Sequence, residues 1–218
     1  MRALLILALC IFAPIKGQKI EKMSFTLHFG SAYNFPTPLK IHQTGYDDIE
    51  LTANYNTEGF KVPVYWDYKL ELETATKFFG IRSTHHKLVL TNAHPDIEGF
   101  EISHGYNLAH LYYGWKRKHF DWFAGGGVAF SHPEGKVRGK TIALEDGISL
   151  YGGKYQFTAP NIELGIRKKI YLYKRLYFNS EVRFIAGYAK PKIIDGYIET
   201  WPVSLHYNFG LGVDIVSK

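Results

Sequence analysis

Histidine recurs with other polar or charged side chains at three places in the middle of the chain. They are His85-His86-Lys87, Ser103-His104 followed by Asn107, and Ser131-His132 followed by Glu134. Imidazole and carboxylate groups transfer protons near neutral pH. A serine beside a histidine also offers the nucleophile and base of a hydrolase, provided that an acid lies within reach. Which chemistry is possible therefore depends on how the surrounding elements place these side chains.

The clearest element is the last one, where apolar and polar side chains alternate strictly. One face carries Val203, Leu205, Tyr207, Phe209, Leu211, Val213 and Ile215, and the other carries Ser204, His206, Asn208, Gly210, Gly212 and Asp214. A period of two over this length exceeds the usual globular strand and is typical of a tilted membrane strand. We expect the apolar face to meet lipid and the polar face to line the interior.

Seven earlier segments repeat this pattern, which makes eight predicted strands. They are 23–29, 64–72, 78–90, 105–115, 120–130, 162–170 and 176–188. Short links near 74, 118 and 173 alternate with long links at 30–61, 91–103, 132–154 and 190–202. Short periplasmic turns and long outer loops are characteristic of bacterial outer-membrane proteins. The sequence thus predicts an all-β fold: a closed eight-stranded antiparallel up-and-down transmembrane β-barrel with both termini at the periplasm. The alternation of Ile49, Leu51, Ala53 and Tyr55 predicts a hairpin above the membrane in the first long link.

The start of the chain predicts export. Met1-Arg2 is followed by the apolar run Ala3–Ala13 and a polar turn at Lys16, the pattern of a signal peptide. We expect residues 1–17 to be the signal peptide and 18–218 to form one barrel domain in the bacterial outer membrane, as a monomer. The only cysteine, Cys10, lies in the predicted signal peptide, so the mature chain would have no disulfide.

The formal charge of +6 suits anionic lipid headgroups, whereas export argues against nucleic acid as a partner. The rival fold, a soluble lipocalin-like barrel, would bury its apolar faces inside. The chain also ends in Asp214–Lys218 without the final aromatic residue that many outer-membrane barrels have.

Charged residues dominate the predicted interior. Acids and bases are equal in number there: Asp67, Glu71, Glu163, Glu181 and Asp214 against Lys69, Arg82, Arg167, Lys169 and Arg183. An eight-stranded barrel is just wide enough for side chains to fill, so we predict an ion-pair plug with His28, His110 and His206 as polar fillers, rather than a channel. Paired carboxylates for acid–base catalysis are the less favoured alternative.

Parity places part of the histidine cluster on the outside of the barrel. His85, Lys87, Asn107 and His132 share the outward parity of Ile81, Leu111 and Val128. At the outer end of the strands they would meet the headgroup of an outer-leaflet lipid, and an ordinary polar rim is the alternative interpretation. Gly135–Thr141 resembles a phosphate-binding loop but is too short and has no strand-to-helix context, so we discard it.

Several short motifs, in this order, resemble a known family. They are Gly59-Phe60 with Pro63-Val64-Tyr65, Phe79-Gly80-Ile81 through His85-His86-Lys87, Ser103 through Leu108, Gly125 through Val128, Ser131 through Glu134, and Gly152-Gly153 leading to Ala159-Pro160. From about residue 59 to the C-terminus the chain resembles the small outer-membrane lipid A oxidase family, which forms 2-aminogluconate in lipopolysaccharide.

The resemblance implies oxygen-dependent oxidation of the proximal glucosamine of lipid A, with molecular oxygen as oxidant and a divalent metal cation as cofactor. Their position at the outer rim makes His85, His104, His132 and Glu134 the candidate catalytic residues for this reaction, of which His85, His132 and Glu134 are candidate metal ligands. Lys87, Asn107 and Ser131 would bind the substrate. Family membership does not guarantee activity, because related barrels carry different functions.

Two other functions stay open. One is lipid A deacylation by a serine hydrolase using Ser131-His132 or Ser103-His104, although the His-x-Ser-Asn pattern of known deacylases is absent. The other is a non-enzymatic barrel that presents loops for adhesion or envelope integrity.

Overall fold

The computed structural model describes residues 19–150 and 153–217. The predicted signal peptide, residues 1–17, lies outside the described residues. No helix in the described part of the chain is long and apolar enough to cross a membrane.

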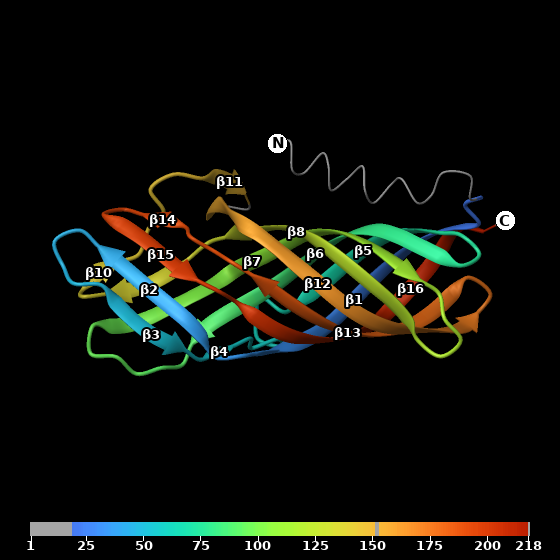
Figure 1. The fold of residues 1–218 in the computed structure, drawn as a ribbon, viewed down its shortest axis with the longest axis horizontal. Helices are drawn as coiled ribbons and strands as arrows, with labels where there is room; N and C mark the ends of the chain where they lie inside the picture. The colour runs from blue at the N-terminus through green and yellow to red at the C-terminus, as the bar shows by residue number, and fades with distance from the viewer. Residues whose placement is uncertain (1–18, 151–152, 218) are drawn as a thin grey trace.

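Eight long strands wrap into a closed barrel (Figure 1). They are β1 (Lys22–Asn34), β5 (Trp66–Glu73), β6 (Lys77–Leu90), β7 (Ile97–Trp115), β8 (Asp121–Ser131), β12 (Gly153–Tyr173), β13 (Leu176–Gly187) and β16 (Val203–Ser217). Around the wall the order is β1, β5, β6, β7, β8, β12, β13 and β16, and β16 pairs back onto β1. Every neighbouring pair is antiparallel. The predicted eight-stranded barrel is confirmed.

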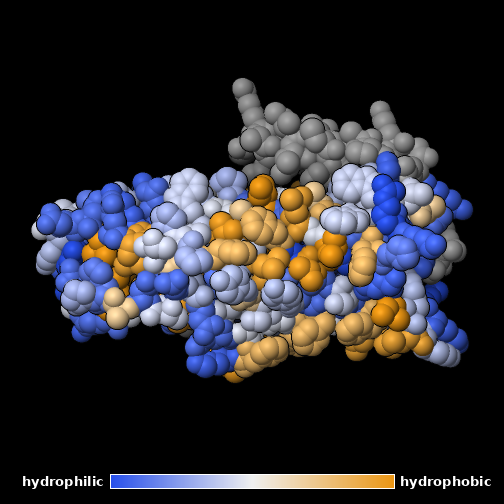
Figure 2. Space-filling model, turned by 60° about the horizontal axis from the view of Figure 1, so that its bottom comes forward, coloured by the Kyte–Doolittle hydropathy of each residue, from blue (hydrophilic) through white to orange (hydrophobic). Residues whose placement is uncertain are grey.

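The apolar faces of these strands point outward. Phe209, Leu211 and Val213 have about half of their surface exposed, whereas His206 and Asp214 are buried. On the face in view, Figure 2 shows apolar residues gathered over the middle of the molecule, with hydrophilic surface toward both ends. So large an apolar surface is stable only in contact with hydrocarbon. The chain is therefore a membrane-spanning barrel, and the soluble lipocalin-like alternative is wrong.

Ion pairs fill the interior, as predicted. Arg183 contacts both Glu163 (Nη1–Oε2, 3.0 Å) and Asp67 (Nη2–Oδ2, 3.2 Å). Nearer the short turns, Glu71 lies between Arg167 and Lys169. Lys169 also contacts Glu73, an acid of β5 that was not among the predicted interior residues. His28 Nδ1 lies 2.8 Å from Asp67 Oδ1. Each of these interior charges has an opposite charge beside it, which offsets the cost of removing it from water.

The long links build a second layer of structure beyond the barrel, which we call the cap. Its main part is a four-stranded sheet in the order β14 (Lys192–Ile193), β15 (Gly196–Thr200), β2 (Thr37–Gln43) and β3 (Ile49–Ala53). The predicted hairpin is confirmed as β2–β3. The shorter strands are β4 (Tyr55–Asn56), β9 (Glu134–Val137), β10 (Lys140–Thr141) and β11 (Ile148–Leu150). The opposite end of the barrel, with the short turns and the C-terminal strand end, we call the turn end (Figure 1).

An apolar core joins the cap to the top of the barrel. Ile41 of β2 and Ile198 of β15 belong to the same buried cluster as Leu108 of β7 and Ile185 of β13. The barrel is therefore filled with charged side chains from its middle to the turn end, and it is covered by packed apolar side chains at the cap end.

At one place in the wall a strand stops short of the cap end. β5 begins only at Trp66, whereas its neighbours β1 and β6 continue toward the cap. Residues 57–65 fill the gap: Thr57 Oγ1 lies 2.9 Å from Asn34 Nδ2 of β1 and 3.2 Å from His86 Nε2 of β6. The side chain of Tyr65 enters the interior, where its hydroxyl lies 2.8 Å from His206 Nδ1. The strand predicted from Val64 thus starts two residues later, and a folded segment covers the outer end of β6.

Candidate functional site

Direct cross-strand neighbours form a row across the outer part of the barrel wall, which we call the outer row. Its members are Phe29, Trp66, His85, Asn107, Phe130 and Phe157, each paired with the next across β1, β5, β6, β7, β8 and β12. Aromatic side chains at this level are typical of the boundary between hydrocarbon and headgroups. His85 and Asn107 are the two polar members and interrupt the aromatic series.

The two polar residues contact each other. His85 Nδ1 lies 2.8 Å from Asn107 Oδ1, a contact that places a hydrogen on Nδ1 and the lone pair on Nε2. The His85 ring also stacks on Trp66, with ring centres 5.6 Å apart. Only 5% of His85 is exposed. The prediction that His85 and Asn107 share one face is confirmed, but His85 lies beneath Trp66 instead of on an open rim.

Lys87 is also covered. The pairing of β6 with β7 shifts register between His86 and Leu88, and Lys87 is 3% exposed. Its Nζ donates a hydrogen bond of 3.0 Å to the carbonyl oxygen of Lys61, in the segment that fills the wall gap. In this arrangement Lys87 anchors residues 57–65 and does not reach toward a phosphate.

His132 and Glu134 lie together on the cap side of β8. Nε2 of His132 is 2.9 Å from Oε1 of Glu134, and Nδ1 contacts the carbonyl oxygen of Lys154. The ring of Tyr155 lies beside the imidazole, at 5.3 Å between centres. His132 and Glu134 thus form a partly exposed pair, which is distinct from the His85–Asn107 pair and lies at the cap end of β8, the strand next to β7.

Ser131 faces the opposite way from His132, because successive side chains of a strand point to opposite faces. It is fully buried, and its Oγ lies 2.5 Å from Thr158 Oγ1. A Ser131–His132 nucleophile and base pair is therefore not assembled, and Ser131 has no access to a substrate outside the barrel. The side chains of Ser103 and His104 lie outside the described ones.

The predicted ligand set does not converge. In the described part of the chain, no three His, Cys, Asp or Glu side chains are grouped closely enough to hold a metal ion. His85 is directed at Asn107, whereas His132 and Glu134 contact each other two strands away. The residues present therefore do not fit the predicted His85–His132–Glu134 centre, and we derive no step through a metal.

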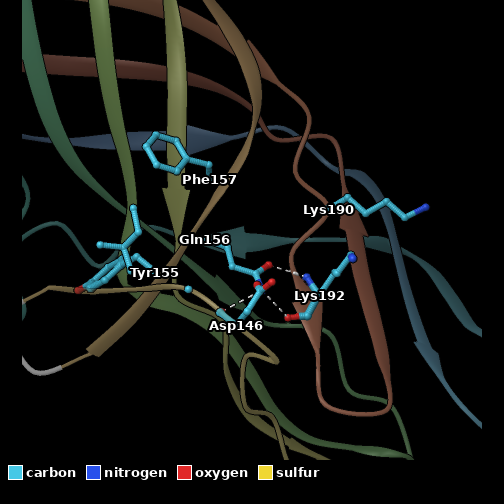
Figure 3. A pocket seen from close by; sticks show the side chains of 8 residues that line it. Asp146, Tyr155, Gln156, Phe157, Lys190 and Lys192 are labelled. Carbon is cyan, nitrogen blue, oxygen red and sulfur yellow. Dashed lines mark hydrogen bonds between the residues drawn. The ribbon is translucent and has the colours of Figure 1, made fainter. Parts of the chain in front are cut away.

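A hollow of about 420 Å³ lies at the β12 end of the outer row. Figure 3 shows Gln156 at its centre, joined to Asp146 and to the backbone of Lys192, with Phe157 and Lys190 at its edges. Gln156 Oε1 accepts a hydrogen bond of 2.7 Å from the Lys192 amide, which ties β12 to β14. These lysines lie in a long link without a recognisable motif, so the sequence pattern gave no signal for them.

Lys190 keeps its charge in this setting. Its Nζ lies 2.9 Å from Glu199 Oε2 of β15. The hydrogen bond to Glu199 raises the pKa of Lys190, and the same contact, with help from Tyr188, lowers the pKa of Glu199. The hollow thus presents ammonium groups beside the exposed ring of Phe157.

Comparison with solved structures identifies the class of fold. The outer membrane protein OprG from Pseudomonas aeruginosa matches over 93% of this chain and 99% of its own, with a TM-score of 0.50 and 14% identity. The outer membrane protein AlkL, solved in DMPC lipid bilayers, matches over 93% and 94%, with a TM-score of 0.50 and 11% identity. No protein-family model and no curated protein matches the sequence. The fold is that of the small bacterial outer-membrane β-barrels.

Proposed function

We propose that the protein acts on lipid A in the outer leaflet, oxidising its proximal glucosamine to 2-aminogluconate. The observation that carries the proposal is the His85–Asn107 pair within the aromatic outer row. A histidine–amide pair on the membrane side of the wall, at headgroup level, would meet the sugar of a glycolipid once Trp66 moves aside, rather than a water-filled pore. The motifs that resemble the lipid A oxidase family include both residues.

The chemistry needs a base beside the anomeric carbon. Oxidation of the C1 hemiacetal to a lactone removes two electrons and two protons, which molecular oxygen takes up to become hydrogen peroxide. Water then opens the lactone to the acid, so the sugar gains one oxygen atom. With its Nδ1 hydrogen directed at Asn107, His85 has Nε2 as the proton acceptor. Since Trp66 stacks on the ring, substrate entry requires that the indole move aside. The dependence on a divalent cation remains a prediction from the resemblance.

Recognition of the phosphorylated headgroup is assigned to the hollow beside Phe157. Lys87 is engaged by the Lys61 carbonyl, whereas Lys190 and Lys192 line an open hollow on the same level of the wall. The hollow lies three strand spacings from His85, about 14 Å along the wall. That separation is comparable with the length of a disaccharide that carries a phosphate.

Mass spectrometry of lipid A tests the proposal. The full chain is expressed in a bacterium with simple lipid A, and lipid A is extracted from cells grown with and without chelator. We expect a mass gain of one oxygen atom, which His85→Asn abolishes and His42→Gln, a cap variant remote from the outer row, leaves intact. Loss of a whole acyl chain would indicate deacylation instead. Unchanged lipid A, with the barrel folded in the membrane, would favour the non-enzymatic barrel.

A further inference from the structure

Charged residues outside the barrel interior are divided unequally between the two ends. At the turn end, basic residues outnumber acidic ones: Lys19, Lys22, Lys77, Lys116, Arg117, Lys118, Lys168, Lys174 and Arg175 against Glu21, Glu73, Asp121 and Asp214. At the cap end acids exceed bases: Asp47, Asp48, Glu50, Glu58, Asp96, Glu98, Glu101, Glu134, Glu145, Asp146, Asp195 and Glu199 against Lys40, Lys61, Lys87, Lys136, Arg138, Lys140, Lys154, Lys190 and Lys192. The positive charge of the chain is therefore concentrated at the turn end.

The few acids of the turn end are largely engaged. Asp214 is buried and lies 3.3 Å from Lys22 Nζ, and Asp121 contacts Arg167 of the interior network at 3.2 Å. Most of the basic side chains are exposed to solvent at the short turns. Lys116 Nζ lies 2.7 Å from Glu73 Oε2, so the described acids of this end neutralise only part of its basic charge.

Four of these lysines lie over aromatic rings at the turn-end edge of the apolar surface. Lys22 lies over Tyr171 at 4.5 Å, Lys77 over Tyr113 at 5.8 Å, Lys168 over Phe120 at 5.9 Å and Lys174 over Tyr173 at 5.1 Å, each from Nζ to the ring centre. We call these four lysines the basic ring. Aromatic rings of this kind lie at the boundary between hydrocarbon and headgroups, so each ammonium group lies at this boundary, within reach of lipid phosphates.

We propose that the basic ring binds anionic phospholipids of the periplasmic leaflet. The short turns of such barrels face the periplasm, where the leaflet of the outer membrane consists of phospholipids. Charge complementarity favours a phosphate-bearing lipid with net negative charge over a zwitterionic one. The acidic excess at the cap end would disfavour the opposite insertion. This inference concerns the end of the barrel remote from the proposed enzymatic site and does not depend on it.

Tryptophan fluorescence reads the two ends separately. Trp115 and Trp122 pair with each other near the turn end, whereas Trp66 and Trp201 lie toward the cap. A variant with Trp66→Phe and Trp201→Phe reports only the turn end. It is reconstituted in phosphatidylcholine vesicles containing increasing fractions of brominated phosphatidylglycerol or brominated phosphatidylcholine, whose bromines quench nearby tryptophans.

We expect brominated phosphatidylglycerol to compete for the turn end about threefold more strongly than brominated phosphatidylcholine. Replacing the four lysines of the basic ring by glutamine should bring the ratio close to one. Replacing Lys40, Lys61, Lys136 and Lys140 by glutamine removes as much charge from the cap and should leave the ratio unchanged. In the unaltered ring, 1 M salt should also reduce the preference, because it screens exposed charges.

The salt titration keeps the test decisive if the ring variant fails to insert. Equal quenching by the two lipids in low salt would overturn the proposal, as would an equal loss of preference in the cap variant. The proposal would also be overturned if the turn end bound an acidic soluble polymer but showed no preference between the two lipids.

Discussion

Lys69 Nζ donates a hydrogen bond of 2.8 Å to Glu181 Oε2 through the centre of the barrel. The two residues belong to β5 and β13, which are not neighbours in the wall. Glu181 also accepts a hydrogen bond from Arg82 of β6. One carboxylate thus connects three strands across the interior.

Removing that carboxylate should destabilise the barrel strongly. Glu181→Leu leaves Lys69 and Arg82 buried without this partner, a change that costs about 3–5 kcal/mol. Urea unfolding in lipid vesicles, followed by the mobility shift of folded barrels on gels, measures the difference. The double variant Glu181→Leu with Lys69→Met should recover part of the loss, and Glu50→Gln in the cap should cost almost nothing. A Glu181→Leu barrel as stable as the original would contradict the plug.

The filled interior also predicts an electrically silent barrel. Charged side chains occupy the middle, and the apolar core covers the cap end, so the described side chains fill the space that an aqueous path for ions would need. Recordings across a planar bilayer should show no conductance steps above those of the bilayer alone. Regular steps from the purified barrel would show that the interior opens.

Close packing at Gly212 predicts a local sensitivity of β16. A Cβ atom there would lie 2.3 Å from the ring of Tyr177, a fully buried residue of β13. Gly212→Ala should therefore cost about 1–3 kcal/mol, the usual penalty of overpacking. Gly99→Ala in β7 is the matched control, because no atom lies within 4 Å of the corresponding position. Similar urea midpoints for the two variants would argue against this packing.

The β2–β3 hairpin should weaken in acid. Hydrogen bonds from Lys40 and then His42 lower the pKa of Asp48 below its ordinary 3.8. Because the folded chain binds this proton less readily than the unfolded chain, the contribution is complete above pH 3.8 and is lost as the pH falls through the lower folded value. Carboxyl NMR titration should give a midpoint below 3.8 that Lys40→Gln moves upward and Lys136→Gln does not. An unchanged midpoint in Lys40→Gln would contradict the assignment.

The barrel was predictable because lipid and interior impose opposite requirements on alternate residues. Leu211 and Asp214 reveal their sides by chemistry alone, and the same contrast revealed the charged interior around Arg183. The cap was only partly predictable. The pairing of β2 with β15 joins segments that are far apart in the chain, such as Ile41 and Ile198, and no local pattern specifies that contact.

The candidate site was predictable in its pairing but not in its accessibility. Regular alternation placed His85 beside Asn107 on one face, and this is confirmed. The alternation did not reveal that β5 begins only at Trp66, nor that residues 57–65 fold over the outer end of β6. Consequently Lys87 has a backbone carbonyl as its partner. Ser131 is buried for a different reason, because it faces the interior beside Thr158. Both residues had been predicted to contact a substrate.

The closing seam of the barrel does not stop at the membrane surface. β1 leads directly into β2 and β15 leads directly into β16, so the strands that pair in the cap are extensions of those that pair at the seam. The first and last parts of the chain must therefore meet twice, once in lipid and once in water. A chain shortened before Gly196 would lose both junctions together, so synthesis must reach its final segment before either half of the molecule can be completed.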